Sequence, residues 1–205
     1  MANNTTNVSV GKPAVAGAIW SAPLGATLPT NATAALDEAF VCMGYVSEDG
    51  LRNTNSPTSE TIKAWGGDTV ATVATEKLDQ FKFKMIEALN VDVLRAVYGS
   101  GNVSGTLAEG VTVRANSSEV EARAWVYETI MTNGTLKRIV VPNGKISEVA
   151  EIVYKDNEAV GYDVTINALP GDEAFSYDTH KEYIQTPAGS AATETGEQSG
   201  DESGG

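Results

Sequence analysis

The sequence predicts a mostly-β protein, an antiparallel β-sandwich or flattened barrel with one flanking α-helix. Apolar and polar residues alternate along several segments, which is the two-residue period of strands that bury one face. Asn-Gly and Asp-Asn pairs separate successive segments, and such pairs are typical of tight turns between antiparallel strands. Only one segment spaces its apolar residues as a helix does.

We expect three parts along the chain. Residues 1–33 form an N-terminal arm, rich in Gly, Pro and Ala, with Trp20 and Leu24 as its anchors. Residues 34–185 form the β-sandwich domain. Residues 186–205 form a disordered acidic tail, because they contain no Val, Ile, Leu or aromatic side chain and cannot bury enough apolar surface to offset their ordering entropy.

A long loop is expected over residues 47–66. Its first part reads SEDGLRNTNSP and is dense in turn-forming residues. A loop of this length in a compact domain usually has a function, although a flexible hairpin tip explains the composition equally well. Two strands follow it, over residues 69–74 and 78–85, and the second alternates between an apolar and a polar face.

One helix is expected over residues 90–98. Asn90 suits the N-cap, Asp92 suits the first turn, and Gly99 suits the position after the last turn. The apolar residues between them recur at three- and four-residue spacing, so the helix has one stripe to lay on a sheet.

Further strands are expected after the helix, with turns at 133–134, 143–144 and 156–157 between some of them. Trp125 and Tyr127 share a strand face with Glu121 and Arg123, an unusual mixture for a face in water. Either this face meets a partner protein, since interfaces favour aromatic residues and Arg, or it belongs to a second core within the domain. The expected strands are residues 110–115, 120–131, 137–141, 146–154, 160–168 and 174–184.

The formal net charge is −13, from 14 basic and 27 acidic residues. Proteins that grip nucleic acid neutralise phosphates with Lys and Arg, so this balance argues against such a function. The acidic surface serves either simple solubility or a contact with DNA that must not adhere. Charge alone does not choose between the two.

The sequence offers little for catalysis. His180 is the only histidine and lies near no nucleophile motif, so we expect an exposed strand residue. Cys42 is the only cysteine, which excludes an intrachain disulfide or a thiolate metal cluster, and it is expected to be a buried small hydrophobe. We expect no enzyme activity, no cofactor and no metal. The N-terminus has no signal-peptide pattern and no apolar run reaches the length of a membrane span, so we expect synthesis in the cytosol and no membrane partner.

Several runs resemble, in their order and spacing, the major tail (tail tube) proteins of siphophages. The resemblance covers about residues 10–185. The runs are GAIWSAPLG (17–25), GYVSEDG (44–50), IKAWGGDTV (62–70), FKFKMIEALN (81–90), VYG (97–99), RIVVPN (138–143), EAVGY (158–162) and EYI (182–184).

The resemblance implies the phage tail-tube fold, a β-sandwich that joins in hexameric rings whose inner sheets close into one 24-stranded barrel. Stacked rings form the tube of a long non-contractile tail, the conduit for genome delivery in the virion. Implied partners are copies of the chain itself, the tape measure protein, the tail initiator or baseplate, the tail terminator, and duplex DNA in transit without specific binding. A virion decoration or receptor-binding β-sandwich module is the alternative, and it predicts discrete monomers or trimers.

Two sets of residues follow as site candidates. Ring-stacking contacts are expected in residues 47–66 together with the N-terminal arm. Lumen-facing carboxylates are expected on the strands, where an acidic wall would let DNA slide. The stacking candidates are Asp49, Arg52, Asn53, Trp65, Trp20 and Leu24, and the lumen candidates are Glu121, Glu128, Glu148, Glu151 and Asp163.

Overall fold

The computed structural model describes residues 3–14 and 17–186, so the expected tail lies, apart from Thr186, outside the described residues. The described part is mostly strand, with one α-helix and three short 3-10 helices, as predicted. The strands are β1 (Gly11–Pro13), β2 (Ile19–Pro23), β3 (Val41–Cys42), β4 (Arg52–Lys63), β5 (Thr69–Met85), β6 (Val103–Thr106), β7 (Gly110–Val113), β8 (Arg123–Met131), β9 (Leu136–Val149), β10 (Tyr162–Leu169) and β11 (Lys181–Gln185); the helices are α1 (Val91–Tyr98), η1 (Thr5–Asn7), η2 (Ser100–Asn102) and η3 (Glu173–Phe175).

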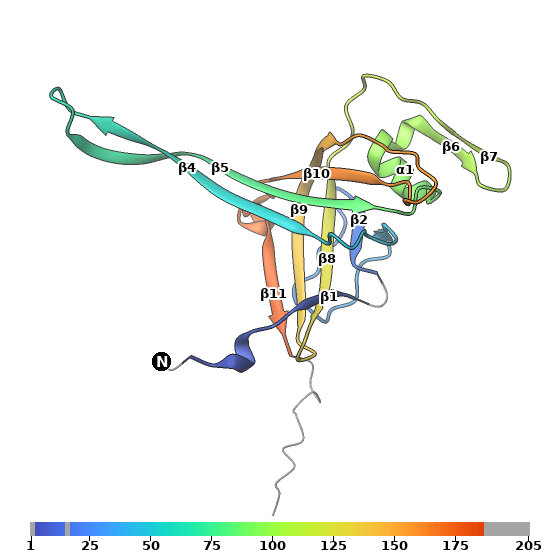
Figure 1. Cartoon of the computed structure of the whole chain (residues 1–205), viewed down its shortest axis with the longest axis horizontal. Coiled ribbons are helices and arrows are strands. Elements are labelled where there is room, and N and C mark those ends of the chain that lie inside the picture. Colours follow the sequence, from blue (N-terminus) through green and yellow to red (C-terminus); the bar gives the residue numbers. More distant parts are fainter. Residues whose placement is uncertain (1–2, 15–16, 187–205) are drawn as a thin grey trace, which may run out of the picture.

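Nine strands form one antiparallel sheet in the order β3-β2-β8-β9-β10-β5-β4, with β1 beside β8 and β11 beside β9. Strand β9 joins two differently directed parts of this sheet, because its first half pairs with β11 and its second half with β10. Figure 1 shows β8, β9 and β11 lying along one axis, while β10, β5 and β4 cross that axis. Strands β6 and β7 form a separate hairpin beside α1.

The main core lies on one face of this sheet. The predicted alternation along β10 is confirmed: Tyr162, Val164 and Ile166 are buried and lie opposite the buried residues of β5. Cross-strand neighbours on one face pack side by side, so the two strands build this part of the core together. The facing β5 residues are Met85, Phe83 and Phe81.

Helix α1 covers this core. The side chain of Asn90 accepts a hydrogen bond from the Asp92 amide at 3.0 Å, and the amide of Gly99 donates to the Arg95 carbonyl at 3.0 Å. The predicted start and end of the helix are therefore confirmed. The helix buries Val93, Leu94, Ala96 and Val97 against the main core.

A second core lies on the other face of β8 and β9. Its buried members include Ala124, Val126 and Val140, and residues 26–40 cover them. Arg138 holds this covering segment in place, because its guanidinium donates to the carbonyls of Asn31 and Ala34 at 2.8 and 2.7 Å and pairs with Glu128.

The two cores decide between the alternatives for β8. Trp125 and Tyr127 are 0% and 1% exposed and lie in the main core, while the intervening residues lie in the second core. Both faces of β8 are buried inside the domain, so these aromatic residues do not form a partner surface.

Three expectations about the chain path are wrong. The segment expected as an irregular arm contributes β1 and β2, which pair with β8. Residues 143–144 form no turn but lie within β9, where a Cβ on Gly144 would meet Trp125 Cδ1 at 2.6 Å. This glycine serves close packing rather than a turn. The expected loop 47–66 is mainly strand β4, paired with β5 along its whole length.

Candidate assembly surfaces

The β4–β5 hairpin extends beyond the sheet that carries it (Figure 1). Strand β5 pairs with β10 only between Gln80 and Met85, so from residue 55 to residue 77 the two hairpin strands have only each other as described neighbours. We call residues 55–77 the arm. Each described side chain of the arm is exposed. An isolated two-stranded hairpin is marginally stable in water, so the arm has the character of a segment that docks onto another surface.

The arm exposes several apolar side chains to solvent. Trp65 at its tip is fully exposed, and Ile62 and Val73 are about half exposed. Ile62 lies opposite Ala71, and Val73 lies two residues further along the same strand, so these three side chains share one face of the hairpin. A grouped apolar face on a projecting hairpin is typical of a protein contact.

The other stacking candidates lie elsewhere. Asp49 and Arg52 form an exposed ion pair of 3.2 Å before the arm begins. Asn53 turns inward and donates to Asp79 at 3.0 Å. Trp20 lies in β2 against the second core, and Leu24 follows β2 and is 52% exposed. The structure thus places only Trp65 on the arm itself.

A buried polar cluster at the root of the arm escaped prediction. The carboxylate of Asp79 has no exposed surface and accepts hydrogen bonds from Asn53 of β4, from Thr179 Oγ1 at 2.5 Å and from His180 Nδ1 at 2.5 Å. Burial raises the pKa of Asp79, but the hydrogen bonds from Thr179, His180 and Asn53 and the charge of His180 outweigh it, so the pKa is lowered from 3.8. His180 is therefore a half-buried partner and not an exposed strand residue.

The alternation of β5 contained the signal for this cluster. Asp79 has the same parity as the core residues Phe81, Phe83 and Met85, so its carboxylate had to point inward. A buried carboxylate needs donors, and the only histidine of the chain is an obvious one.

The four strands β4, β5, β10 and β9 form a sheet with two open edges. The outer edge of β4 has no described neighbour, and β9 beyond Gly144 pairs with β10 alone among the described strands. Unpaired strand edges are templates for adding another strand. The edge strands β4 and β9 run in opposite directions, because each of the three pairings between them is antiparallel.

The lumen candidates are scattered. Glu148 of β9 lies opposite Thr165 of β10, and Asp163 lies two residues before Thr165 on the same strand. Glu148 and Asp163 therefore share one face of the sheet, the face that also carries Lys84, opposite Asp163. Glu121 and Glu151 are exposed outside the strands, and Glu121 accepts a hydrogen bond from Ser100. Glu128 pairs with the buried Arg138, so its charge is neutralised within the fold.

Within the described ranges, no three His, Cys, Asp or Glu side chains gather as metal ligands would. Cys42 is half-buried in β3 and unbonded. None of the helices in the described part has the length and apolar character to cross a membrane.

Comparison with known proteins identifies the family. No curated protein matches the chain. The family described as phage tail tube protein matches residues 1–187, which is nearly the whole sequence. The chain therefore belongs to the phage tail tube protein family, a structural family, and is a component of the virion tail that assembles with copies of itself and with other tail components.

Proposed function

We propose that the chain forms hexameric rings that stack into the tube of a long non-contractile tail and conduct the genome through it. The single observation that carries this proposal is the arm, a hairpin whose described side chains are all exposed and whose apolar face and Trp65 have no partner among the described residues. A second copy supplies that partner.

The open edges support closure of the ring. In a ring of identically oriented copies, β4 of one copy meets the second half of β9 of the next. Because each copy contributes four alternating strands, this junction is antiparallel, like every pairing within the sheet. Closing the ring also removes edges that would otherwise aggregate.

The dimensions fit the cargo. Twenty-four strands about 4.8 Å apart and tilted by about 40° form a barrel roughly 48 Å across at the backbone. Side chains of about 5 Å on each wall leave nearly 40 Å, which accommodates hydrated duplex DNA. The same channel holds the tape measure protein before the genome passes, and initiator and terminator proteins cap the two tube ends.

We assign ring stacking to the arm. Ile62, Val73 and Trp65 dock on the adjacent ring. Full burial of an exposed apolar side chain stabilises a contact by about 1.5 to 3 kcal/mol, and the half-exposed Ile62 and Val73 gain roughly half of that. Leu24 lies exposed after β2 and contributes at the periphery of the contact. Asp49 and Arg52 pair with each other on the sheet at the root of the arm, so we leave them out of this assignment. Asn53 and Trp20 support the stacking contact indirectly. Asn53 stabilises the root of the arm through Asp79, and Trp20 packs in the sheet against the second core.

Replacement of residues 57–77 by Asn-Gly tests this assignment. Ser56 and Leu78 face each other across the hairpin, so a two-residue turn joins them without disturbing the register. We expect a folded protein that forms rings but no tubes, as seen by circular dichroism and negative-stain electron microscopy. Leu107→Ser on the β6–β7 hairpin removes a similarly exposed apolar residue and should leave tubes unchanged.

The outcomes separate the claims. Tubes of normal length from the shortened protein would show that the arm does not stack the rings. A wild-type protein that stays monomeric at high concentration would contradict the assembly itself.

A further inference from the structure

The sheet formed by β4, β5, β10 and β9 has one face that the helix leaves uncovered. Helix α1 and the main core lie on the opposite face. The cross-strand register identifies the side chains on the uncovered face, which we call the open face. In the central part of the sheet they are Arg52 and Thr54 of β4, Gln80, Lys82 and Lys84 of β5, Asp163, Thr165 and Asn167 of β10, and Lys145 and Glu148 of β9.

The strands make this face basic. They contribute four cations and only two carboxylates to it, a net charge of +2, although the chain as a whole has 14 basic and 27 acidic residues. Of the five carboxylates expected to line a channel, Glu148 and Asp163 lie on this face, and the four cations outnumber them.

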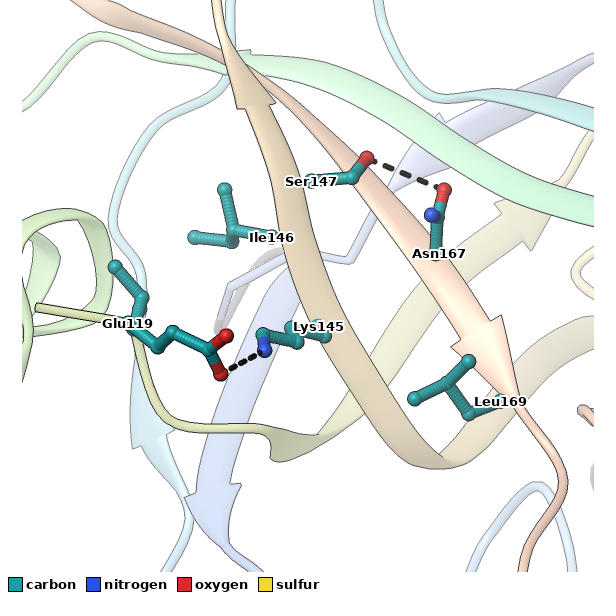
Figure 2. A pocket seen from close by; sticks show the side chains of 7 residues that line it. Glu119, Lys145, Ile146, Ser147, Asn167 and Leu169 are labelled. Atoms are coloured by element: carbon teal, nitrogen blue, oxygen red, sulfur yellow. Dashed lines mark hydrogen bonds and ion pairs between the residues drawn. The ribbon is translucent and has the colours of Figure 1, made fainter.

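Every cation of the open face is nevertheless paired. Lys82 lies 3.6 Å from Asp163 of the neighbouring strand. The other three cations meet carboxylates from segments outside the four strands, and Figure 2 shows one of these pairs, Lys145 with Glu119. These three pairs are Arg52–Asp49 at 3.2 Å, Lys84–Glu158 at 2.7 Å and Lys145–Glu119 at 2.7 Å.

Stability does not account for these three carboxylates. Asp49, Glu119 and Glu158 have 67%, 85% and 42% of their side chains exposed, and exposed ion pairs contribute at most about 1 kcal/mol. Their effect on charge is larger. With them the open face has four cations and five carboxylates, so its net charge changes from +2 to −1. Counting Lys155 as well, which lies 3.4 Å from Glu158, the net charge becomes 0.

We propose that Asp49, Glu119 and Glu158 keep the open face from binding duplex DNA by occupying its cations. Free Lys and Arg side chains bind phosphates and release counterions, whereas a cation that already holds a carboxylate must first lose it. That this polyanion is DNA rests on the proposed function, in which the open face lines the channel through which the genome passes. The carboxylates then allow a basic sheet to face moving DNA.

The test removes these charges without changing side-chain size. The triple variant Asp49→Asn, Glu119→Gln, Glu158→Gln changes the open face from −1 to +2. The control triple variant Glu38→Gln, Glu109→Gln, Glu173→Gln makes the same change in total charge at exposed positions away from this face. Circular dichroism checks that both variants fold.

Sedimented tubes are incubated with a fluorescent DNA duplex of ~20 base pairs at about 50 mM salt, where phosphate contacts are strong. We expect the first variant to retain at least about ten-fold more duplex than the wild type or the control, and to release it at about 200 mM salt. Equal retention by both variants, or none by the first, would overturn the proposal.

The unassembled subunit separates this proposal from the proposed function. Its open face is accessible, so fluorescence anisotropy with the same duplex should show binding by the first variant alone. Absence of wild-type tubes would contradict the tube assignment, and this measurement would still decide the role of the three carboxylates.

Discussion

The Nδ1 atom of His180 lies 2.5 Å from the Oδ2 atom of Asp79, deep at the root of the arm. This contact joins the segment before β11 to the strand that carries the arm. Thr179 and Asn53 complete the set of donors around the carboxylate, and Phe81 packs edge-on against the imidazole. The direction of the arm is thus fixed by a buried polar cluster rather than by apolar packing alone.

Asp79→Asn should lower the free energy of unfolding by about 3 to 5 kcal/mol, because it leaves buried donors without their charged acceptor. Urea denaturation measures this loss. Asp163→Asn is the control, since Asp163 makes only a long, exposed ion pair and its loss should cost less than about 1 kcal/mol. Equal effects of the two substitutions would contradict the importance of the cluster.

The same carboxylate predicts a pH dependence. The pKa of Asp79 is lower in the folded protein than its ordinary value of 3.8, so the folded state binds this proton less readily than the unfolded state. Its contribution to stability is therefore present above about pH 4 and is lost as the pH falls through the folded-state pKa. Thermal unfolding between pH 7 and about pH 2 should show a steeper acid loss in the wild type than in Asp79→Asn. Parallel curves would refute this.

Gly144→Ala should destabilise the fold by about 1 to 3 kcal/mol, because the added methyl group meets Trp125 Cδ1 at 2.6 Å and Ile166 Cγ2 at 2.9 Å. Thermal unfolding and near-ultraviolet circular dichroism, which reports on Trp125, measure the effect. Gly101→Ala is the matched control, since a Cβ there enters open space. A stable Gly144→Ala protein with unchanged near-ultraviolet signal would mean that the strand shifts freely.

Tyr127→Phe should leave stability unchanged or raise it by about 1 kcal/mol. The Tyr127 hydroxyl is buried without a hydrogen-bond partner among the described residues, and burial, together with the charge of Asp79, raises the pKa of this phenol. Removing the hydroxyl removes a desolvated polar group and keeps the ring stacked on Phe81 at 5.0 Å. Chemical denaturation gives the answer, and a loss of more than about 1 kcal/mol would reveal a bond to this hydroxyl.

Local signals predicted the elements that depend on local chemistry. The cap at Asn90, the stop at Gly99 and the alternation along β10 are visible in the sequence because each depends on near neighbours. Strand β8 was harder, since both of its faces are buried and alternation cannot show which face is the core.

The prediction of a loop over residues 47–66 was wrong for a related reason. Strand β4 buries nothing, so its polar, turn-rich sequence gave no strand pattern, and only pairing with β5 makes it regular. Two of the outside partners of the open-face cations were also out of reach, because Glu119 and Glu158 come from segments distant in sequence that only the fold brings to Lys145 and Lys84. Asp49 differs, since it lies three residues before Arg52.

The arm leaves the molecule at one end of its sheet only. A column built from copies that share one orientation is therefore directional: every hairpin points the same way, and the first and last layers present unlike surfaces. Elongation and termination then require different contacts. A protein with a hairpin like the arm can bind only the end that lacks exposed hairpins, and a protein with a docking surface for the hairpin can bind only the end that exposes them.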